Sequence, residues 1–292
     1  MINYSALKNR PFADIVQTYA AKDSILYALG VGLGHDPMDE RQLQYVYEKN
    51  LRALPTMAAV LGYPGFWVKE PDSGVDWVQV LHGEQAITIH QPLPAAGTVV
   101  GKFRVKGIVD KGKGRGALLL QERGVFDRKS GALLATVESL TFARGDGGFS
   151  ESGDNGPKGG DPAPPPPPHT PDTAPEQTCD LPTLPQAALI YRLSGDYNPL
   201  HAEPAVAAAA KVPRPILHGL ATYGAAGHAI LRTFCDYDAA KLKSLSVRFS
   251  APVYPGETIR TEMWRKGDRV QFRARVVERD VVVLSNGVAQ LA

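Results

Sequence analysis

The chain has 292 residues, of which 43% are hydrophobic and 21% charged, and its formal net charge is +2. This apolar content supplies one large core or two moderate ones and excludes a disordered chain, and a length near 300 favours two domains. The small net charge creates no field that points to nucleic acid, whereas a small anionic substrate remains compatible with it.

The first half predicts helices followed by long strands. Asp23 is expected to cap a helix that ends in the glycine-rich stretch 30–34, and Pro55–Leu61 is typical of a short buried helix. The glycine-rich stretch lacks G-x-G-x-x-G spacing and follows a helical pattern, so we expect no nucleotide site there. From Trp77 onward apolar and polar residues alternate, which predicts strands around Val78–Val80, Ile87–Ile89, Thr98–Val109, Gly116–Phe126 and Ala132–Phe142.

A segment dense in Gly, Asp and Pro separates the two halves. It contains five consecutive prolines, Pro164–Pro168, which favour an extended polyproline II conformation and cannot build a core. We interpret it as a spacer, with recruitment of an SH3-like or WW-like partner as the alternative. The predicted organisation is therefore a first domain over 1–145, a linker over 146–176 and a second domain over 177–292.

The second half repeats the order of the first. Its expected helices are Pro185–Leu193, Pro204–Lys211 and Leu220–Leu231, and its expected strands are Ser244–Phe249, Thr258–Arg265, Arg269–Glu278 and Val281–Gln290. Two segments correspond between the halves: Ile89–Gly97 parallels Phe249–Gly256, and Leu54–Ala58 takes the place of Ile216–Leu220. Two copies of one α+β domain explain this pattern.

The residues that carry chemistry lie in the second copy. Asp196, Asn198 and His201 bring a carboxylate, an amide and an imidazole into one short segment, where they can hold and activate a water molecule. The Asn-Pro step fixes a tight turn that brings His201 back beside Asp196, whereas a continuous helix would place them on different faces. The first copy has no such segment, so we expect it to be catalytically silent.

Gly219 begins the apolar helix of the second copy. A backbone N–H at a helix N-terminus is a natural donor to a developing negative charge, and glycine lets a substrate approach closely. His218 precedes it, either as an anchor of the loop or in direct contact with substrate. His82 also precedes a glycine, but no acidic motif accompanies it, and we interpret it as structural.

The segment Ser194–His201 resembles the signature of MaoC-like (R)-specific 2-enoyl-CoA hydratases of the hydratase 2 type, which also occur as a domain of the peroxisomal multifunctional enzyme. The likeness extends over Leu81–Gln85, His218–Leu220 and Phe249–Gly256. It implies a double hotdog, in which each half is a long antiparallel sheet around a central helix. It also implies homodimers, and a silent first half that leaves room for a bulky acyl tail.

The function implied is the reversible addition of water to a trans-2-enoyl-CoA, giving (3R)-3-hydroxyacyl-CoA in fatty-acid or side-chain β-oxidation. Asp196 would be the principal base and His201 would orient the water, although the sequence leaves open which of the two does which. Asn198 would hold the water or the dyad geometry, and the Gly219 N–H would bind the thioester oxygen. The alternatives are a 3-hydroxyacyl-thioester dehydratase in synthesis and a non-catalytic acyl-CoA-binding subunit.

Coenzyme A would enter as part of the substrate, so we expect no separate cofactor. Its phosphates need cations, and the candidates are Lys106, Lys111, Lys113, Arg214 and Arg248. His218 is the other residue that we expect to bind the substrate. No metal-ligand spacing is present, so we expect no metal. The two isolated cysteines fit a reducing compartment, and no signal peptide, membrane-spanning run or C-terminal Ser-Lys-Leu is present. We expect a cytoplasmic protein, with a peroxisomal one possible in a eukaryote.

Overall fold

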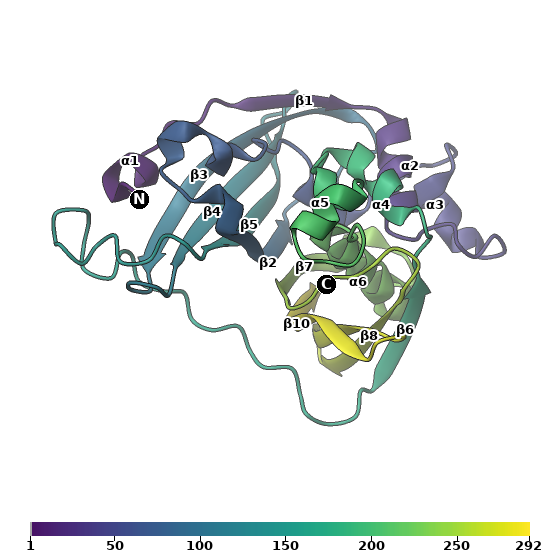
Figure 1. Cartoon of the computed structure of the whole chain (residues 1–292). Coiled ribbons are helices and arrows are strands. Elements are labelled where there is room, and N and C mark those ends of the chain that lie inside the picture. The colour runs from purple at the N-terminus through teal and green to yellow at the C-terminus, as the bar shows by residue number, and fades with distance from the viewer. Residues whose placement is uncertain (1) are drawn as a thin grey trace.

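All ten named strands of residues 2–292, the part of the chain that the computed structural model describes, join one antiparallel sheet (Figure 1). The strands are β1 (Ile15–Tyr19), β2 (Val80–Ile89), β3 (Gly97–Asp110), β4 (Ala117–Asp127), β5 (Leu133–Ala143), β6 (Gln177–Pro182), β7 (Leu242–Phe249), β8 (Thr258–Lys266), β9 (Arg269–Val276) and β10 (Val281–Leu291). Their order across the sheet is β1-β3-β4-β5-β2-β7-β10-β9-β8-β6.

Counted outward from the centre of the sheet, the strands of the two halves follow in the same order. The first half contributes β2-β5-β4-β3-β1 and the second half contributes β7-β10-β9-β8-β6, so that β4 is the counterpart of β9. The halves join where β2 pairs with β7, and there Ile87 lies opposite Leu245, both fully buried. The predicted repeat of one α+β unit is therefore confirmed.

The helices are α1 (Tyr4–Lys8), α2 (Ala21–Gly30), α3 (Leu43–Val46), α4 (Ala187–Tyr191), α5 (Pro204–Ala209) and α6 (Gly219–Phe234). Short 3-10 helices are η1 (Glu40–Gln42), η2 (Pro55–Ala59), η3 (Trp67–Lys69), η4 (Pro71–Ser73), η5 (Trp77–Gln79), η6 (Arg192–Ser194), η7 (Pro199–His201) and η8 (Ala239–Lys241).

Helix α6 is the central helix of the second half. Every residue from Ala221 to Leu231 is buried, and the helix contacts β6, β7, β8 and β10. In the first half only the five-residue η2 takes the corresponding place, and it packs against α6. Gly227 permits this approach, because a Cβ there would lie 2.5 Å from Cγ2 of Thr56. The two halves thus share a sheet but differ in the length of helix that fills it.

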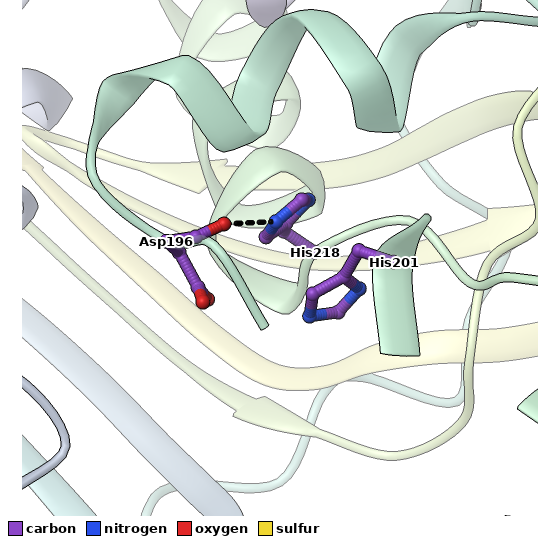
Figure 2. Close-up of side chains that lie close together, drawn as sticks. All are labelled: Asp196, His201 and His218. Atoms are coloured by element: carbon purple, nitrogen blue, oxygen red, sulfur yellow. Dashed lines mark hydrogen bonds between the residues drawn. The ribbon is translucent and has the colours of Figure 1, made fainter. Parts of the chain in front are cut away.

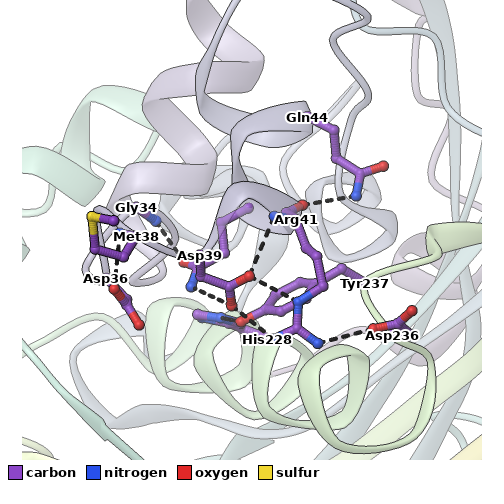
Figure 3. Close-up of polar contacts among 10 residues, drawn as sticks. Gly34, Asp36, Met38, Asp39, Arg41, Gln44, His228, Asp236 and Tyr237 are labelled. Atoms are coloured by element: carbon purple, nitrogen blue, oxygen red, sulfur yellow. Dashed lines mark hydrogen bonds and ion pairs between the residues drawn. The ribbon is translucent and has the colours of Figure 1, made fainter.

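A polar cluster fastens the N-terminal helices to the second half of α6 (Figure 3). His228 of α6 is 2% exposed, with Nδ1 3.3 Å from the carbonyl oxygen of Val31 and Nε2 3.1 Å from the hydroxyl of Tyr237. Arg41 lies over the Tyr237 ring and pairs with Asp236 at 2.9 Å. Desolvation lowers the pKa of His228 to about 4, so this imidazole is neutral at pH 7.

Several element boundaries differ from the sequence prediction. Asp23 does not cap α2; it is the third helical residue, and its carboxylate accepts a hydrogen bond from the Ala20 N–H at 2.7 Å, as in a capping box. The strand expected at Val78–Val80 is wrong, because Val78 lies in η5 and only Val80 belongs to a strand. The strand expected at Ile87–Ile89 is the end of β2, which is bulged between His82 and Glu84. The edge strands β1 and β6 were not predicted.

The glycine- and proline-rich segment has two parts. Residues 146–161 pack on the first half, where Phe149 is buried and Asp161 accepts hydrogen bonds from Tyr4 and Lys8. The extended chain that follows loops away toward β6 in Figure 1. His169 accepts a hydrogen bond from the Gln271 side chain of β9 at 2.9 Å, so this part is tied to the second half.

Candidate active site

Three of the four predicted catalytic residues, Asp196, Asn198 and His201, lie on a turn between α4 and α5. Gly195 has φ +118°, a conformation that glycine adopts readily, and it reverses the chain after η6. The Asp196 carboxylate then accepts a hydrogen bond from the Asn198 N–H at 3.2 Å. The Asn198 side chain accepts one from the Leu200 N–H at 3.0 Å and so caps η7, which ends at His201. The amide of Asn198 therefore holds the turn that positions His201.

His201 is held as a neutral imidazole. It is 8% exposed, and its Nδ1 lies 2.9 Å from the carbonyl oxygen of Ile216. Because a carbonyl can only accept, Nδ1 carries the proton and Nε2 keeps its lone pair. Desolvation lowers the pKa of His201, which favours this neutral form. Nε2 of His201 is thus a hydrogen-bond acceptor and a base at pH 7.

His218 stacks on His201 and ties the turn to α6 (Figure 2). The two ring centroids are 3.6 Å apart, and Nε2 of His218 lies 3.1 Å from the backbone oxygen of Asp196. Burial, and then the neighbouring His201, lower the pKa of His218 to about 4. His218 therefore anchors the backbone of Asp196 as a neutral donor.

Asp196, His201 and His218 each present one atom within 4.8 Å of the others. This separation accommodates a water molecule that makes hydrogen bonds of about 2.8 Å to the Asp196 carboxylate and to Nε2 of His201. Two imidazoles and a carboxylate are also a donor set that a metal ion accepts, although their sequence spacing does not indicate one. The absence of a metal therefore stays a prediction.

Gly219 is the first residue of α6, and its backbone is exposed to solvent. The first N–H groups of a helix have no intrahelical partner and lie at the positive end of the helix dipole. A Cβ at Gly219 would lie 3.2 Å from Cε1 of Phe249, a tight contact, so glycine leaves the backbone beside this ring uncrowded. The geometry suits a donor to a developing oxyanion.

The first half supplies the opposite wall. The ring of His82, on β2, lies 4.7 Å from that of Phe249, and solvent reaches it although desolvation lowers its pKa to about 4. Tyr63 is 45% exposed, yet its pKa is raised first by desolvation and then by the charge of Asp196. Side chains that solvent reaches but whose pKa values desolvation shifts are typical of a concave surface, and the charge of Asp196 acts on both. We therefore infer a recess, called the catalytic recess below, between Asp196 and these two residues of the first half. Sequence reasoning had no signal for Tyr63 and interpreted His82 as structural.

The MaoC-like domain family matches residues 167–287, and the MFE-2 hydratase 2 N-terminal domain family matches residues 17–145. The chain is 41% identical to the peroxisomal enoyl-CoA hydratase 2 of Arabidopsis thaliana, over 93% of this chain and 90% of that protein. It is 39% identical to 3-hydroxyacyl-thioester dehydratase Y of Mycobacterium tuberculosis, over 92% and 91%. The chain belongs to the MaoC-like hydratase 2 family.

The fold comparison agrees with this membership. A MaoC-like dehydratase from Phytophthora capsici superposes with a TM-score of 0.85 at 34% identity, covering 100% of this chain and 99% of that one. A Mycobacterium tuberculosis protein described as a double hotdog matches with a TM-score of 0.53 at 15% identity, covering 94% and 93%. The double hotdog is therefore confirmed, and its two halves correspond to the two family matches.

Two of the predicted coenzyme A ligands face away from the site of this MaoC-like protein. Arg248 pairs with Glu84 across the β2–β7 junction at 2.6 Å, on the face of β7 opposite to Phe249. Lys106 on β3 forms an ion pair with Glu138. Because their charges already have carboxylate partners, this placement gives no support to a role in binding coenzyme A.

The remaining predicted ligands divide into two groups. Lys111 lies over the ring of Phe142 at 5.3 Å, and Lys113 follows it in the turn between β3 and β4 of the first half. Arg214 lies in the loop that leads into α6 and stacks over Tyr254 at 5.2 Å. Since this loop also supplies the carbonyl that binds His201, Arg214 is the cation of this set with a direct structural link to the dyad.

Proposed function

We propose that this protein is an (R)-specific trans-2-enoyl-CoA hydratase, which reversibly forms (3R)-3-hydroxyacyl-CoA in β-oxidation. The observation that carries the proposal is that the Asp196 carboxylate and the His201 imidazole, whose Nδ1 is bound to Ile216, lie within 4.8 Å of each other on a turn anchored to the helix that begins at Gly219. The curated relatives named enoyl-CoA hydratase 2 support it.

In this mechanism one water lies between Asp196 and His201. Its oxygen adds to C3 of the enoyl thioester as one of its protons passes to the dyad, and C2 then receives a proton from the same side. The thioester carbonyl becomes enolate-like, and the Gly219 N–H stabilises its oxygen. Because a single water and a single dyad serve both steps, addition is syn. The (3R) configuration of the product follows from the face of the double bond that the water attacks, and the relatives named enoyl-CoA hydratase 2 support that assignment. We assign Asp196 as the principal base and His201 as the group that orients the water.

The same site runs in reverse as a dehydratase, and one relative bears that name. The direction depends on the carrier and on concentrations rather than on the residues. A non-catalytic acyl-CoA-binding subunit would have no need of a neutral histidine beside a carboxylate, which argues against that alternative.

The test uses purified protein and a series of trans-2-enoyl-CoA esters. We expect loss of the conjugated thioester absorbance, a (3R) product and no release of free thiol. Asp196→Asn should lower kcat by about 10²–10⁴, because the amide keeps the shape and loses the base. Asp154→Asn, at an exposed position outside the site, is the matched control. Unchanged absorbance with every ester, or an active Asp196→Asn protein, contradicts the proposal.

Metal independence needs its own measurement. We expect full activity after treatment with a strong chelator, together with substoichiometric metal by elemental analysis. Loss of activity that is restored by one metal would instead assign Asp196, His201 and His218 as its ligands.

We also propose a cytoplasmic homodimer. Two buried free cysteines, Cys179 and Cys235, fit a reducing compartment. No helix within residues 2–292 is long and apolar enough to cross a membrane.

The exposed aromatic pair Phe66 and Trp77, with ring centroids 6.3 Å apart, offers an apolar surface for association into the homodimer. Light scattering after gel filtration measures the mass, and a tagged protein in its own cell tests the compartment against a peroxisomal one.

A further inference from the structure

Arg123 on β4 is a buried cation without a carboxylate partner. Its side chain is 4% exposed, and no Asp or Glu within residues 2–292 lies at ion-pair distance from it. Nη2 donates to the carbonyl oxygens of Ala58 and Ala59 at 3.2 and 2.8 Å, at the end of η2. Nε has no partner among the described residues. A buried charge left in this state is costly unless something else pairs with it.

Tyr63 connects this cation to the catalytic recess. The Arg123 guanidinium carbon lies 5.5 Å from the centroid of the Tyr63 ring, and solvent reaches Tyr63. The charges of Asp196 and Arg123 both act on the Tyr63 hydroxyl. Arg123 therefore lies behind a residue that lines the same recess as the catalytic carboxylate, on the side of the silent half.

The inward face of β4 differs from that of its counterpart in the catalytic half. On β9 the inward positions are all apolar and fully buried: Val270, Phe272, Ala274 and Val276. On β4 the inward residues Leu119 and Val125 enclose two polar ones, Gln121 and Arg123. In the catalytic half, the long helix α6 packs on this face of the sheet, whereas in the first half the short η2 and Trp67 of η3 do so.

Unlike Arg123, Gln121 has a hydrogen-bond partner for each polar atom of its side chain. Its amide oxygen accepts from Nε1 of Trp67 at 3.0 Å, and its amide nitrogen donates to the Thr141 hydroxyl at 2.7 Å. An acyl recess that serves only hydrocarbon tails would need an apolar lining at the position of Arg123. A guanidinium with donors to spare is instead suited to an anionic group that enters with the substrate.

We propose that Arg123 and Tyr63 form a subsite for a carboxylate carried by the distal part of the acyl chain, so that the preferred substrates are trans-2-enoyl-CoA esters with an acidic tail. The proposal rests on the proposed hydratase function. The carboxylate pairs with the free donors of Arg123, and the Tyr63 ring separates this subsite from the reacting carbons beside Asp196. A methyl terminus of the same length would leave the guanidinium desolvated and unpaired.

The experiment compares esters that end in a carboxylate with esters of the same length that end in a methyl group, over a series of chain lengths. At the length that reaches Arg123, we expect wild-type kcat/KM to be about 10–100-fold higher for the carboxylate ester, as is typical when one charge-assisted pair decides selectivity. Arg123→Met fills similar space without the charge and should abolish or reverse this preference. Arg123→Lys should retain part of it, and crotonyl-CoA, which is too short to reach the subsite, should be hydrated equally by all three proteins.

Binding of the corresponding saturated acyl-CoA esters, measured by calorimetry, gives a readout that does not need turnover. If no enoyl ester is hydrated, the hydratase function fails, and the binding preference still decides the subsite. A wild-type protein that prefers the methyl ester at every length overturns the proposal, whether or not Arg123→Met folds. Equal weakening of all esters by Arg123→Met also overturns it, because Arg123 would then serve η2 or the coenzyme A portion.

Discussion

Asn198 offers a direct test of how the catalytic turn is held. Its side chain accepts a hydrogen bond from the Leu200 N–H at 3.0 Å and so caps η7, the single turn that carries His201. Asn198→Ala removes this cap, and such losses cost about 1 kcal/mol. In a chain of this length that lowers Tm by about 2 °C. If the whole of that energy biases His201 toward its catalytic position, kcat falls by at most about five-fold, since 1.4 kcal/mol is a factor of ten.

The assay is hydration of crotonyl-CoA by Asn198→Ala, Asn198→Ser and wild type, with thermal unfolding of each. Serine is also an effective cap, so Asn198→Ser should recover most of the activity and of the stability. If Asn198 instead held the reacting water, serine would not replace it. A loss above about 100-fold in both variants, with unchanged Tm, would refute the capping role.

Three further outcomes are expected. Gly219→Ala places a methyl group against Phe249 and should lower kcat/KM by about ten-fold or more with little change in Tm; full activity would remove its N–H from the mechanism. Because the pKa of His201 is lowered, its neutral form persists as pH falls, and the acid limb of kcat/KM should inflect below the ordinary value of 6.5, as a pH–rate profile will show. The pKa of His228 is lowered from 6.5 to about 4, so its stability contribution is complete above pH 6.5 and decreases as pH falls, by about 2 kcal/mol at about pH 5. Urea unfolding of His228→Gln should lack that part of the pH dependence, and an unchanged dependence would place it elsewhere.

Local patterns in the sequence predicted much of this structure. Alternation identified the long strands other than β2 to within two or three residues, because each has one face against the core. The turn around Asp196 and His201 could also be predicted from a local pattern, because an Asn-Pro step restricts the backbone within a few residues. The edge strands β1 and β6 were missed because they are short, and only their partners β3 and β8 specify them.

The recess depended on contacts that no local pattern encodes. The charge of Asp196 acts on Tyr63 and His82, which come from the other half of the chain, because β2 pairs with β7 and η2 packs on α6. Arg248 had the charge expected of a phosphate ligand, but its carboxylate partner lies 164 residues away in sequence. The sequence does contain a signal for Arg123, because this charged residue occupies an inward position of an alternating strand.

The covalent link between the two halves makes the asymmetry of this recess possible. If two identical chains formed the sheet, every inward residue would occur twice, and an arginine at the position of Arg123 would also have to fit under a full central helix. Strand β9 shows what that environment requires, since Phe272 and its inward neighbours are apolar and fully buried. Duplication within one chain removes this constraint, so that one copy retains α6 and the dyad while the other shortens its helix and retains a charge. The residues that select the acyl tail should therefore be sought in the first half, at inward positions whose counterparts in the second half are apolar.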